Sequence, residues 1–304
     1  MVAFVFPGQG SQFTGMGKDL YNDFPQARAV FEEANDSLGM NLTKLCFEGP
    51  EDDLKLTANT QPAILTVSIA ALRVVQGECD LQPVFAAGHS LGEYSALVCA
   101  GALSFADAVR IVRQRGTFMQ EAVPAGLGTM AAIMDLSNAE LEQVCREAAA
   151  GEVVAPANFN SPGQVVIAGH TGAVERAITL ARDRGAKRAI LLPVSAPFHS
   201  SLMMPAAERL QRVLKDVAVG PMSLPVVSNV DAAANQDSGR VRQLLVSQVS
   251  APVRWDESVT VMARSGVERF VEIGPGKVLC GLIKRIVKGV ATENVQDAAG
   301  VKAL

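Results

Sequence analysis

Several residue types are scarce in this chain. It contains one Trp, two Tyr and three His among 304 residues, and its formal net charge is −4. Because nucleic-acid surfaces are bound by basic faces with stacking rings, we expect no nucleic-acid partner. No apolar run reaches the roughly 18 residues of a membrane span, and the N-terminus leads straight into an apolar run at 2–6 without a signal-peptide pattern. We therefore expect no membrane partner and a cytoplasmic location.

Cysteine is also infrequent and irregularly spaced. The five Cys residues include no C-x-x-C pair. An odd number of scattered cysteines is typical of reduced, mostly buried thiols, and this spacing offers no metal-binding pattern. We expect no disulfide and no metal site.

What the chain does have is enough apolar sequence for a large core. Hydrophobic residues make up 49% of the chain, which suits one large domain or a large and a small one. Apolar strand candidates at 2–6, 84–89, 224–228 and 268–273 alternate with helical patterns. This order predicts an α/β fold with a largely parallel sheet.

The middle of the chain has a different order. Apolar runs and helical patterns follow one another as βαββαβ, the order of a ferredoxin-like unit. The segments are 129–134, 137–149, 153–159, 164–169, 171–184 and 187–192, with Asn160-Ser161-Pro162-Gly163 between the third and fourth. We predict a small subdomain at 124–193 inserted in a larger α/β domain formed by 1–123 and 194–304. A cleft between the two is the natural place for a substrate.

Gly88-His89-Ser90-Leu91-Gly92 is a G-x-S-x-G sequence between an apolar run and a helical pattern. Strand, tight turn and helix is the order of a nucleophile elbow, because the flanking glycines allow a turn that lifts the serine hydroxyl out of the sheet. The pentapeptide alone is weak, since a chain of this length contains one by chance roughly one time in ten. Its context favours a catalytic Ser90 over a serine that only caps a helix.

A serine hydroxyl needs a base, and only three histidines are available. His89 precedes Ser90 at a strand end, where successive side chains point to opposite faces, so we expect a structural role for it. His170 follows an apolar run and opens a helix, which favours a strand-end or capping role. His199 ends the loop 195–198 and is the best candidate. A helix start nearby would disfavour the imidazolium and keep this ring neutral.

Elbow hydrolases usually add an acid between the serine and the histidine along the chain. None of the acids between Ser90 and His199 lies in an obvious strand-end loop. The partner that orients His199 is therefore left open between a carboxylate and a backbone carbonyl.

Arg115 falls on the apolar stripe of a helix predicted at 104–120, whereas Arg110 and Arg113 fall on the opposite side, where we expect them to be solvated. A buried guanidinium stays charged and needs an anionic partner, preferably a carboxylate held by two parallel hydrogen bonds. That partner is either an internal Asp or Glu or a substrate. Together with an elbow serine, the second alternative suggests an acyl group that carries its own carboxylate.

A series of motifs extends over the whole chain. They are FPGQGSQ at 6–12, QPA at 61–63, GHSLGEYSAL at 88–97, RQRG at 113–116, NSPGQ at 160–164, APFHS at 196–200, Gln248 with PVRW at 252–255, and EIGPGKVL at 272–279. In this order they resemble the malonyl-CoA:acyl carrier protein transacylases, the acyltransferase family of bacterial type II fatty-acid synthesis. The resemblance implies an α/β hydrolase-like core with a ferredoxin-like insertion, in agreement with the pattern above.

The resemblance also implies a reaction. Ser90 would be acylated, His199 would act as general base and acid, and Arg115 would hold the malonyl carboxylate. The malonyl group would pass from malonyl-CoA to the phosphopantetheine thiol of acyl carrier protein in a ping-pong sequence, with the CoA thioester as substrate and no cofactor.

Other site residues are implied in the same way. The backbone N–H groups of Gln9 and Leu91 would form the oxyanion hole. Gln248 would orient His199 through its main-chain carbonyl, although without the resemblance Gln248 reads as a surface residue. Phe198 matches a malonyl-selective pattern in which a bulky ring narrows the space beside the acyl C2, a preference of only about 1–3 kcal/mol per methyl group.

The implied partners are malonyl-CoA and acyl carrier protein, and we expect a monomer. Because such carrier proteins are acidic, docking should use a basic face, either Lys284, Arg285 and Lys288 or Lys187 and Arg188. Each cluster is also readable as a solvated face. Two other functions stay open: a thioesterase or carboxylesterase with the same elbow, and a scaffold that binds carrier proteins without catalysis.

Overall fold

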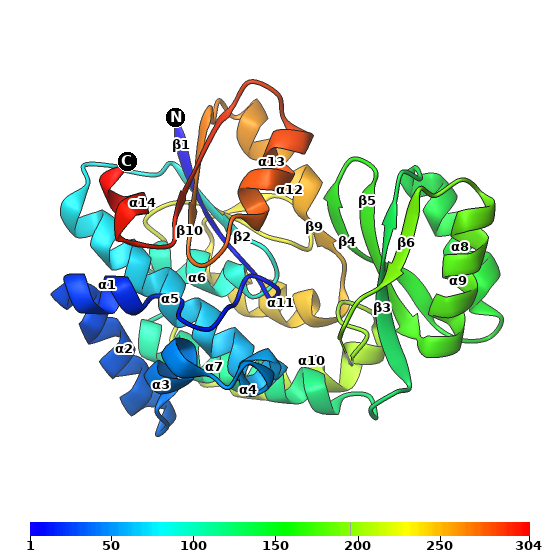
Figure 1. Cartoon of the computed structure of the whole chain (residues 1–304), viewed down its shortest axis with the longest axis horizontal. Helices are drawn as coiled ribbons and strands as arrows, with labels where there is room; N and C mark the ends of the chain where they lie inside the picture. The colour runs from blue at the N-terminus through cyan, green and yellow to red at the C-terminus, as the bar shows by residue number, and fades with distance from the viewer. Residues whose placement is uncertain (195) are drawn as a thin grey trace.

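The computed structural model of the chain describes residues 1–194 and 196–304, and its strands form two separate sheets (Figure 1). The larger sheet has the order β11-β10-β1-β2-β7-β8, and the smaller one has the order β6-β3-β5-β4-β9. The strands of the larger sheet are β1 (Val2–Phe6), β2 (Phe85–Gly88), β7 (Val226–Val227), β8 (Ala234–Asn235), β10 (Arg269–Ile273) and β11 (Ala291–Val295). Those of the smaller sheet are β3 (Gly128–Met134), β4 (Val154–Ser161), β5 (Gln164–His170), β6 (Arg188–Leu191) and β9 (Val253–Arg254).

The larger sheet is parallel at every pairing except that of β7 with β8. β1 lies near its middle because its sequence, VAFVF, is apolar throughout and buried from Ala3 onward. The predicted α/β class with a largely parallel sheet is confirmed. The strand expected at 224–228 is reduced to two residues, and β8 and β11 were not expected.

Helices cover the larger sheet (Figure 1). They are α1 (Lys18–Asp23), α2 (Pro25–Leu38), α3 (Leu42–Glu48), α4 (Glu51–Lys55), α5 (Thr57–Glu78), α6 (Gly92–Cys99), α7 (Phe105–Glu121), the 3-10 helix Ser201–Met203, α10 (Met204–Lys215), α11 (Ser238–Ser250), α12 (Trp255–Arg264), α13 (Val278–Ile286) and α14 (Ala298–Lys302). α5 is apolar on nearly all sides, so it is buried through most of its length between its neighbours α2 and α7. No helix within the described residues is both long and apolar enough to cross a membrane.

The smaller sheet has the βαββαβ order that the sequence predicts. α8 (Asn138–Ala149) and α9 (Thr171–Asp183) pack on one of its faces (Figure 1). Ser137 and Glu140 form a capping box that starts α8 where the apolar periodicity begins. β9 adds a parallel strand beside β4, with Asn158 opposite Val253, so residues after 194 also contribute to this sheet. The bounds 124–193 stay a prediction.

Candidate active site

Ser90 lies in the sharp turn between β2 and α6, with a φ of 52°. The structure leaves no room for a side chain at Gly88 or Gly92, the two glycines that flank Ser90. A Cβ on Gly88 would lie 1.9 Å from the carbonyl carbon of Gly92, and a Cβ on Gly92 would lie 2.1 Å from the carbonyl oxygen of Phe6. The strand, turn and helix therefore pack so closely that only glycine fits at either side of the serine. This is the geometry of the nucleophile elbow.

His199 reaches Ser90 from a segment 109 residues away. Its Nε2 lies 2.7 Å from Ser90 Oγ, and its Nδ1 lies 2.8 Å from the main-chain oxygen of Gln248. A carbonyl only accepts, so Nδ1 donates to it and Nε2 is left to accept the serine proton. A backbone carbonyl thus occupies the place that a triad acid would take. Ser195, the first residue of the loop before His199, lies outside the described residues.

The His199 ring is 4% exposed. Burial and, to a smaller extent, the neighbouring charge of Arg115 lower its pKa to about 3. Both effects favour the neutral imidazole that the sequence predicts, and a contribution from the helix start after His199 stays a prediction. Only a neutral ring can take a proton from serine.

Arg115 points inward from α7 and is 1% exposed. Its Nη2 donates to Ser90 Oγ at 3.1 Å and to Gln248 Oε1 at 2.9 Å, and its Nη1 donates to Gln61 Oε1 at 2.8 Å. Among the described residues, no carboxylate oxygen lies within 4.0 Å of this guanidinium. Its hydrogen-bond partners are therefore two side-chain amides and the Ser90 hydroxyl, all of which are neutral. Of the two alternatives from the sequence, the structural ion pair is not formed within residues 1–194 and 196–304.

The close approach of α7 to α5 places Arg115 beside Gln61. Gly116 allows it, since a Cβ there would lie 2.6 Å from the carbonyl oxygen of Thr57. Pro62 inside α5 has no N–H for the carbonyl of Ala58, four residues back. Arg113 Nη1 donates to that carbonyl at 2.9 Å. The expectation of a solvated Arg113 is therefore wrong: this side chain is half-buried and supports the start of α5.

The two remaining histidines have structural partners. His89 is half-buried, and its Nε2 donates to Asn160 Oδ1 at 2.8 Å, which ties the elbow to β4 of the smaller sheet. β4 continues through Asn160, which the sequence placed in a turn. The Nδ1 of His170 accepts from the backbone N–H of Val153 at 2.9 Å. Neither ring hydrogen-bonds to Ser90 Oγ.

Behind the elbow lie two buried polar residues that the sequence analysis did not single out. Asn229 accepts from the backbone N–H of Ser90 at 2.7 Å and donates to the carbonyl of Gly88 at 2.7 Å, so it holds both sides of the turn. Glu93 Oε2 accepts from the backbone N–H of Asn229 at 2.9 Å and from Gln248 Nε2 at 2.8 Å. Burial raises the pKa of Glu93 to about 7. Only their polarity inside apolar sequence could have indicated them.

Gln248 is fully buried on α11, contrary to its reading as a surface residue when its sequence context is taken alone. Its main chain contacts His199 and its side chain contacts Arg115. One residue therefore supports both the base and the cation.

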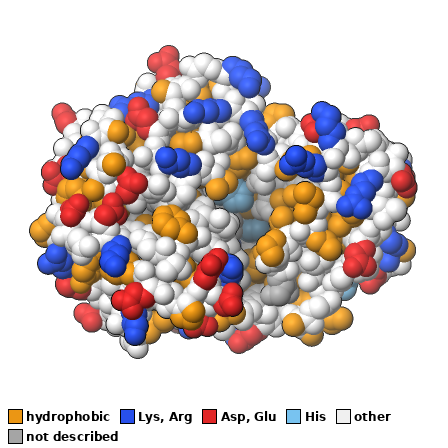
Figure 2. All heavy atoms as spheres, in the orientation of Figure 1, with side chains coloured by type: hydrophobic (Ala, Val, Ile, Leu, Met, Phe, Trp, Pro, Cys, Tyr) orange, Lys and Arg blue, Asp and Glu red, His pale blue; other side chains and the backbone are white. Residues whose placement is uncertain are grey.

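A cavity of about 120 Å³ lies in front of Ser90 between the two sheets. The larger part of the molecule is the larger sheet with its helices, and the smaller part is the smaller sheet with α8 and α9. The cavity wall includes Gln9, Leu91 and Phe198 from the larger part and Met130 and Asn158 from the smaller part. Figure 2 shows the corresponding hollow between the two parts of the molecule, with histidine atoms at its floor. Within the described residues, neither the N–H of Gln9 nor that of Leu91 donates to another protein group. Both are free to face a developing negative charge.

An elbow serine, a buried base and an inward cation define a serine acyltransferase or hydrolase site. Residues 3–302 match the model of the family described as acyl transferase domain. The chain is 51% identical over 301 residues to malonyl CoA-acyl carrier protein transacylase of Escherichia coli K12, covering 99% of this chain and 97% of that protein. It is also 51% identical to the Bacillus subtilis 168 protein of the same name, over 97% of this chain and 93% of the relative.

Solved structures agree. The acyl carrier protein S-malonyltransferase of Vibrio cholerae superposes with a TM-score of 0.97 at 50% identity, covering 99% of both chains. A malonyl-transacylase solved in complex with its type II PKS acyl-carrier protein gives a TM-score of 0.97 at 49% identity, over 99% of this chain and 98% of that one. This chain therefore belongs to the malonyl CoA-acyl carrier protein transacylase family of acyltransferases.

Proposed function

We propose that this protein transfers the malonyl group of malonyl-CoA to the phosphopantetheine thiol of acyl carrier protein, as a step that supplies fatty-acid synthesis. The observation that carries the proposal is the environment of one atom. Ser90 Oγ contacts a neutral base at 2.7 Å and a guanidinium at 3.1 Å, and among the described residues no carboxylate oxygen lies within 4.0 Å of that guanidinium. A nucleophile beside an unneutralised cation fits an acyl group with its own carboxylate.

In the first half-reaction Ser90 Oγ attacks the thioester carbonyl carbon, and His199 Nε2 takes the serine proton. The negative charge on the former carbonyl oxygen faces the N–H groups of Gln9 and Leu91. The tetrahedral intermediate collapses, the carbon–sulfur bond breaks, and CoA leaves with the proton from His199. Ser90 then carries the malonyl ester. Arg115, at the same cavity, donates to the malonyl carboxylate.

In the second half-reaction the pantetheine thiol gives its proton to His199 and attacks the malonyl ester. The ester bond breaks, and Ser90 recovers its proton from His199. Burial makes the imidazolium unfavourable, so the ring carries a proton only while a negative charge lies beside it. No step uses a metal or a redox cofactor.

The cavity supports acyl selectivity. Its volume of about 120 Å³ suits a small acyl group, and the half-buried Phe198 ring forms part of its wall. We assign to Phe198 the exclusion of a methyl branch at C2 of the acyl group. This preference is softer than the carboxylate requirement, since one methyl is worth about 1–3 kcal/mol.

The carrier protein would dock at the mouth of this cavity, on a protein that acts in the cytoplasm as a monomer. Complex formation by a relative at 49% identity supports this partner. In the second cluster named from the sequence, Lys187 pairs with Asp135 at 3.6 Å. Lys284 and Lys288 on and after α13 are exposed and, within the described residues, have no ion pair. We therefore assign docking to the α13 cluster.

Intact-mass analysis tests the proposal. The wild type mixed with malonyl-CoA should gain one malonyl group and lose it when carrier protein is added, whereas Ser90→Ala should gain none. Ser201→Ala, a change at an exposed neighbouring serine, is the matched control and should behave as the wild type. A normal adduct on Ser90→Ala would remove Ser90 from the mechanism. Rapid consumption of malonyl-CoA without any acceptor would favour a thioesterase instead.

A further inference from the structure

The side-chain amide of Gln248 joins the elbow to the inward arginine. Its Nε2 donates to the main-chain oxygen of Ser90 at 3.0 Å and to Glu93 Oε2 at 2.8 Å, while its Oε1 accepts from Arg115 Nη2 at 2.9 Å. The whole residue is buried, so no water competes for these contacts. The orientation of this amide decides whether its oxygen or its NH₂ group faces the Arg115 guanidinium.

Turning the amide over would break every one of these contacts. The amide oxygen would then face three acceptors, namely the Ser90 carbonyl, the Glu93 carboxyl and the more distant Asn229 Oδ1 at 3.5 Å. The NH₂ group would face the guanidinium, which only donates. Buried polar groups without partners are costly, so the turned orientation is disfavoured. Glu93 supplies the nearest, at 2.8 Å, of the three acceptors that distinguish the orientations.

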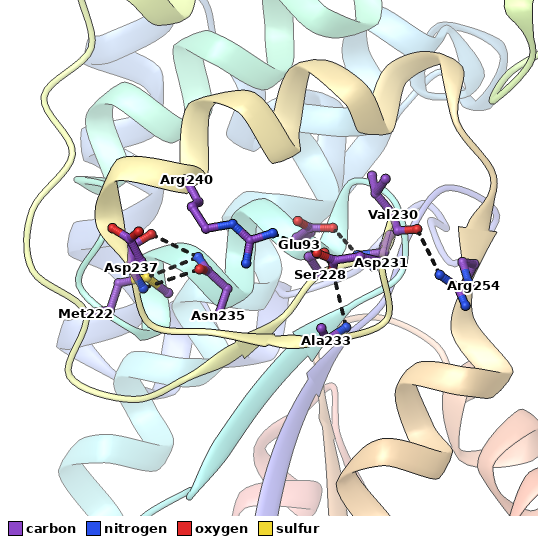
Figure 3. Close-up of polar contacts among 11 residues, drawn as sticks. Glu93, Met222, Ser228, Val230, Asp231, Ala233, Asn235, Asp237, Arg240 and Arg254 are labelled. Atoms are coloured by element: carbon purple, nitrogen blue, oxygen red, sulfur yellow. Dashed lines mark hydrogen bonds and ion pairs between the residues drawn. The ribbon is translucent and has the colours of Figure 1, made fainter.

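Glu93 is itself fixed in place. The carboxyl is 2% exposed, and the backbone N–H of Asn229 holds its Oε2 at 2.9 Å. Figure 3 shows Glu93 against the loop that carries Ser228 and Asp231, with Arg240 reaching from α11 toward Asp231. Arg240 pairs with Asp231 at 2.9 Å, so its charge is directed at this partner.

We propose that Glu93 is a positioning residue for substrate recognition, which holds the Gln248 amide so that its oxygen faces Arg115 and keeps the guanidinium directed at the acyl pocket. The inference rests on the proposed function, because it concerns the site that would receive the malonyl carboxylate. It does not concern the base, since His199 is held by the main chain of Gln248 and not by its side chain.

What the site requires of Glu93 is an accepting oxygen rather than a charge. Within the described residues its Oε1 makes no hydrogen bond, so a proton can lie on Oε1 while Oε2 still accepts from Gln248. The raised pKa of Glu93 is consistent with this, because burial favours the neutral carboxyl. Glu93→Gln keeps an accepting oxygen, whereas Glu93→Met keeps the length of the side chain but not the acceptor.

The test compares the rates at which Ser90 is acylated by malonyl-CoA and by acetyl-CoA, which lacks the carboxylate. Glu93→Met should lower the malonyl-to-acetyl ratio about tenfold or more, the size expected when a charge-assisted contact is misplaced. Glu93→Gln should restore most of the ratio. Gln248→Met should lower it as much as Glu93→Met, and the double variant should lower it no further.

The ratio does not depend on how much of each variant is folded, so a loss of stability cannot imitate the result. Equal loss of both acyl groups in Glu93→Met, with an unchanged ratio, would overturn the inference and leave Glu93 a structural residue. A reduced ratio in Glu93→Gln equal to that in Glu93→Met would overturn the acceptor argument. Failure of the wild type to form a malonyl adduct would instead reject the proposed function.

Discussion

At the scale of single residues, Arg115 should carry the preference for an acyl group with a free carboxylate. Arg115→Ala removes a two-pronged charged donor from a buried site, so acylation by malonyl-CoA should fall about 100-fold or more. Acylation by acetyl-CoA should fall much less. Arg110→Ala changes an exposed arginine of the same helix that pairs with Asp107, and it should leave both rates unchanged. Rapid-quench measurement of both adducts checks this, and equal losses would make Arg115 structural.

The pH dependence of acylation should report the burial of His199. Its pKa is lowered to about 3, so the ring stays neutral and able to accept a proton at every pH above that value. The rate of malonyl adduct formation should therefore be flat from about pH 8 to about pH 5, instead of halving near the ordinary histidine value of about 6.5. Glu93 is a neighbouring carboxyl with a raised pKa. Measuring the same pH profile in Glu93→Gln, which has no carboxyl at this position, distinguishes titration of Glu93 from titration of His199. An acid limb near 6.5 in both proteins would contradict the assignment.

Some residues of the site could be predicted from the sequence and others could not. Ser90 is set by a local pattern, His199 by the scarcity of histidine, and Arg115 by its place on an apolar stripe. Asn229 contacts Ser90 across 139 positions, and Gln248 contacts Glu93 across 155. No local pattern encodes such distant hydrogen bonds between uncharged or buried groups. The half-buried position of Arg113 escapes prediction for the same reason, since its partner is a carbonyl that Pro62 leaves free in another helix.

At the scale of elements, the long apolar strands and amphipathic helices follow from periodicity, and the short strands do not. β8 and β9 have two residues each, too few for any alternation to show. β11, with the sequence ATENV, is a half-buried strand at the edge of its sheet, and most of its side chains are polar. Its backbone pairs with β10, but no apolar pattern in the sequence predicts this strand. The predicted and observed ends of a strand differ where the strand ends in polar residues. For example, β4 continues through Asn160 and Ser161, two residues beyond the predicted end at 159.

The elbow depends on the packing of β1, β2 and α6 at glycine. Gly92→Ala would place a methyl group 2.1 Å from the carbonyl oxygen of Phe6, a backbone atom that cannot give way without moving β1. We expect a loss of at least about 2 kcal/mol in the free energy of unfolding, with malonyl adduct formation reduced in the fraction that still folds. Gly281→Ala on α13 meets nothing within 4 Å and should change stability by less than about 1 kcal/mol, in the stabilising direction. Denaturant unfolding of both variants checks this, and equal stability would show that the elbow tolerates a side chain.

At the scale of the whole molecule, the distribution of charge matters more than its sum. The chain has a formal net charge of −4, so an acidic carrier protein is repelled on average and must be met by a local basic surface. Arg285 on α13 donates to Gln164 at the start of β5 at 2.7 Å, which places the α13 cluster at the junction of the larger and smaller parts. The cavity lies between the same two parts.

Charge reversal at the α13 cluster should therefore weaken the second half-reaction alone. In Lys284→Glu with Lys288→Glu, kcat/KM for carrier protein should fall about tenfold or more, while malonyl adduct formation from malonyl-CoA stays near wild type, because neither lysine lines the cavity. For the wild type the same constant should decline as salt rises, since exposed charges are screened within about 8 Å at physiological ionic strength. Lys44→Glu with Lys215→Glu makes the same change in net charge on α3 and α10, away from the cavity wall, and serves as the matched control. Two results together would show that docking does not depend on these charges. Transfer to carrier protein would be insensitive to salt, and charge reversal at the α13 cluster and at Lys187 with Arg188 would leave the transfer rate unchanged.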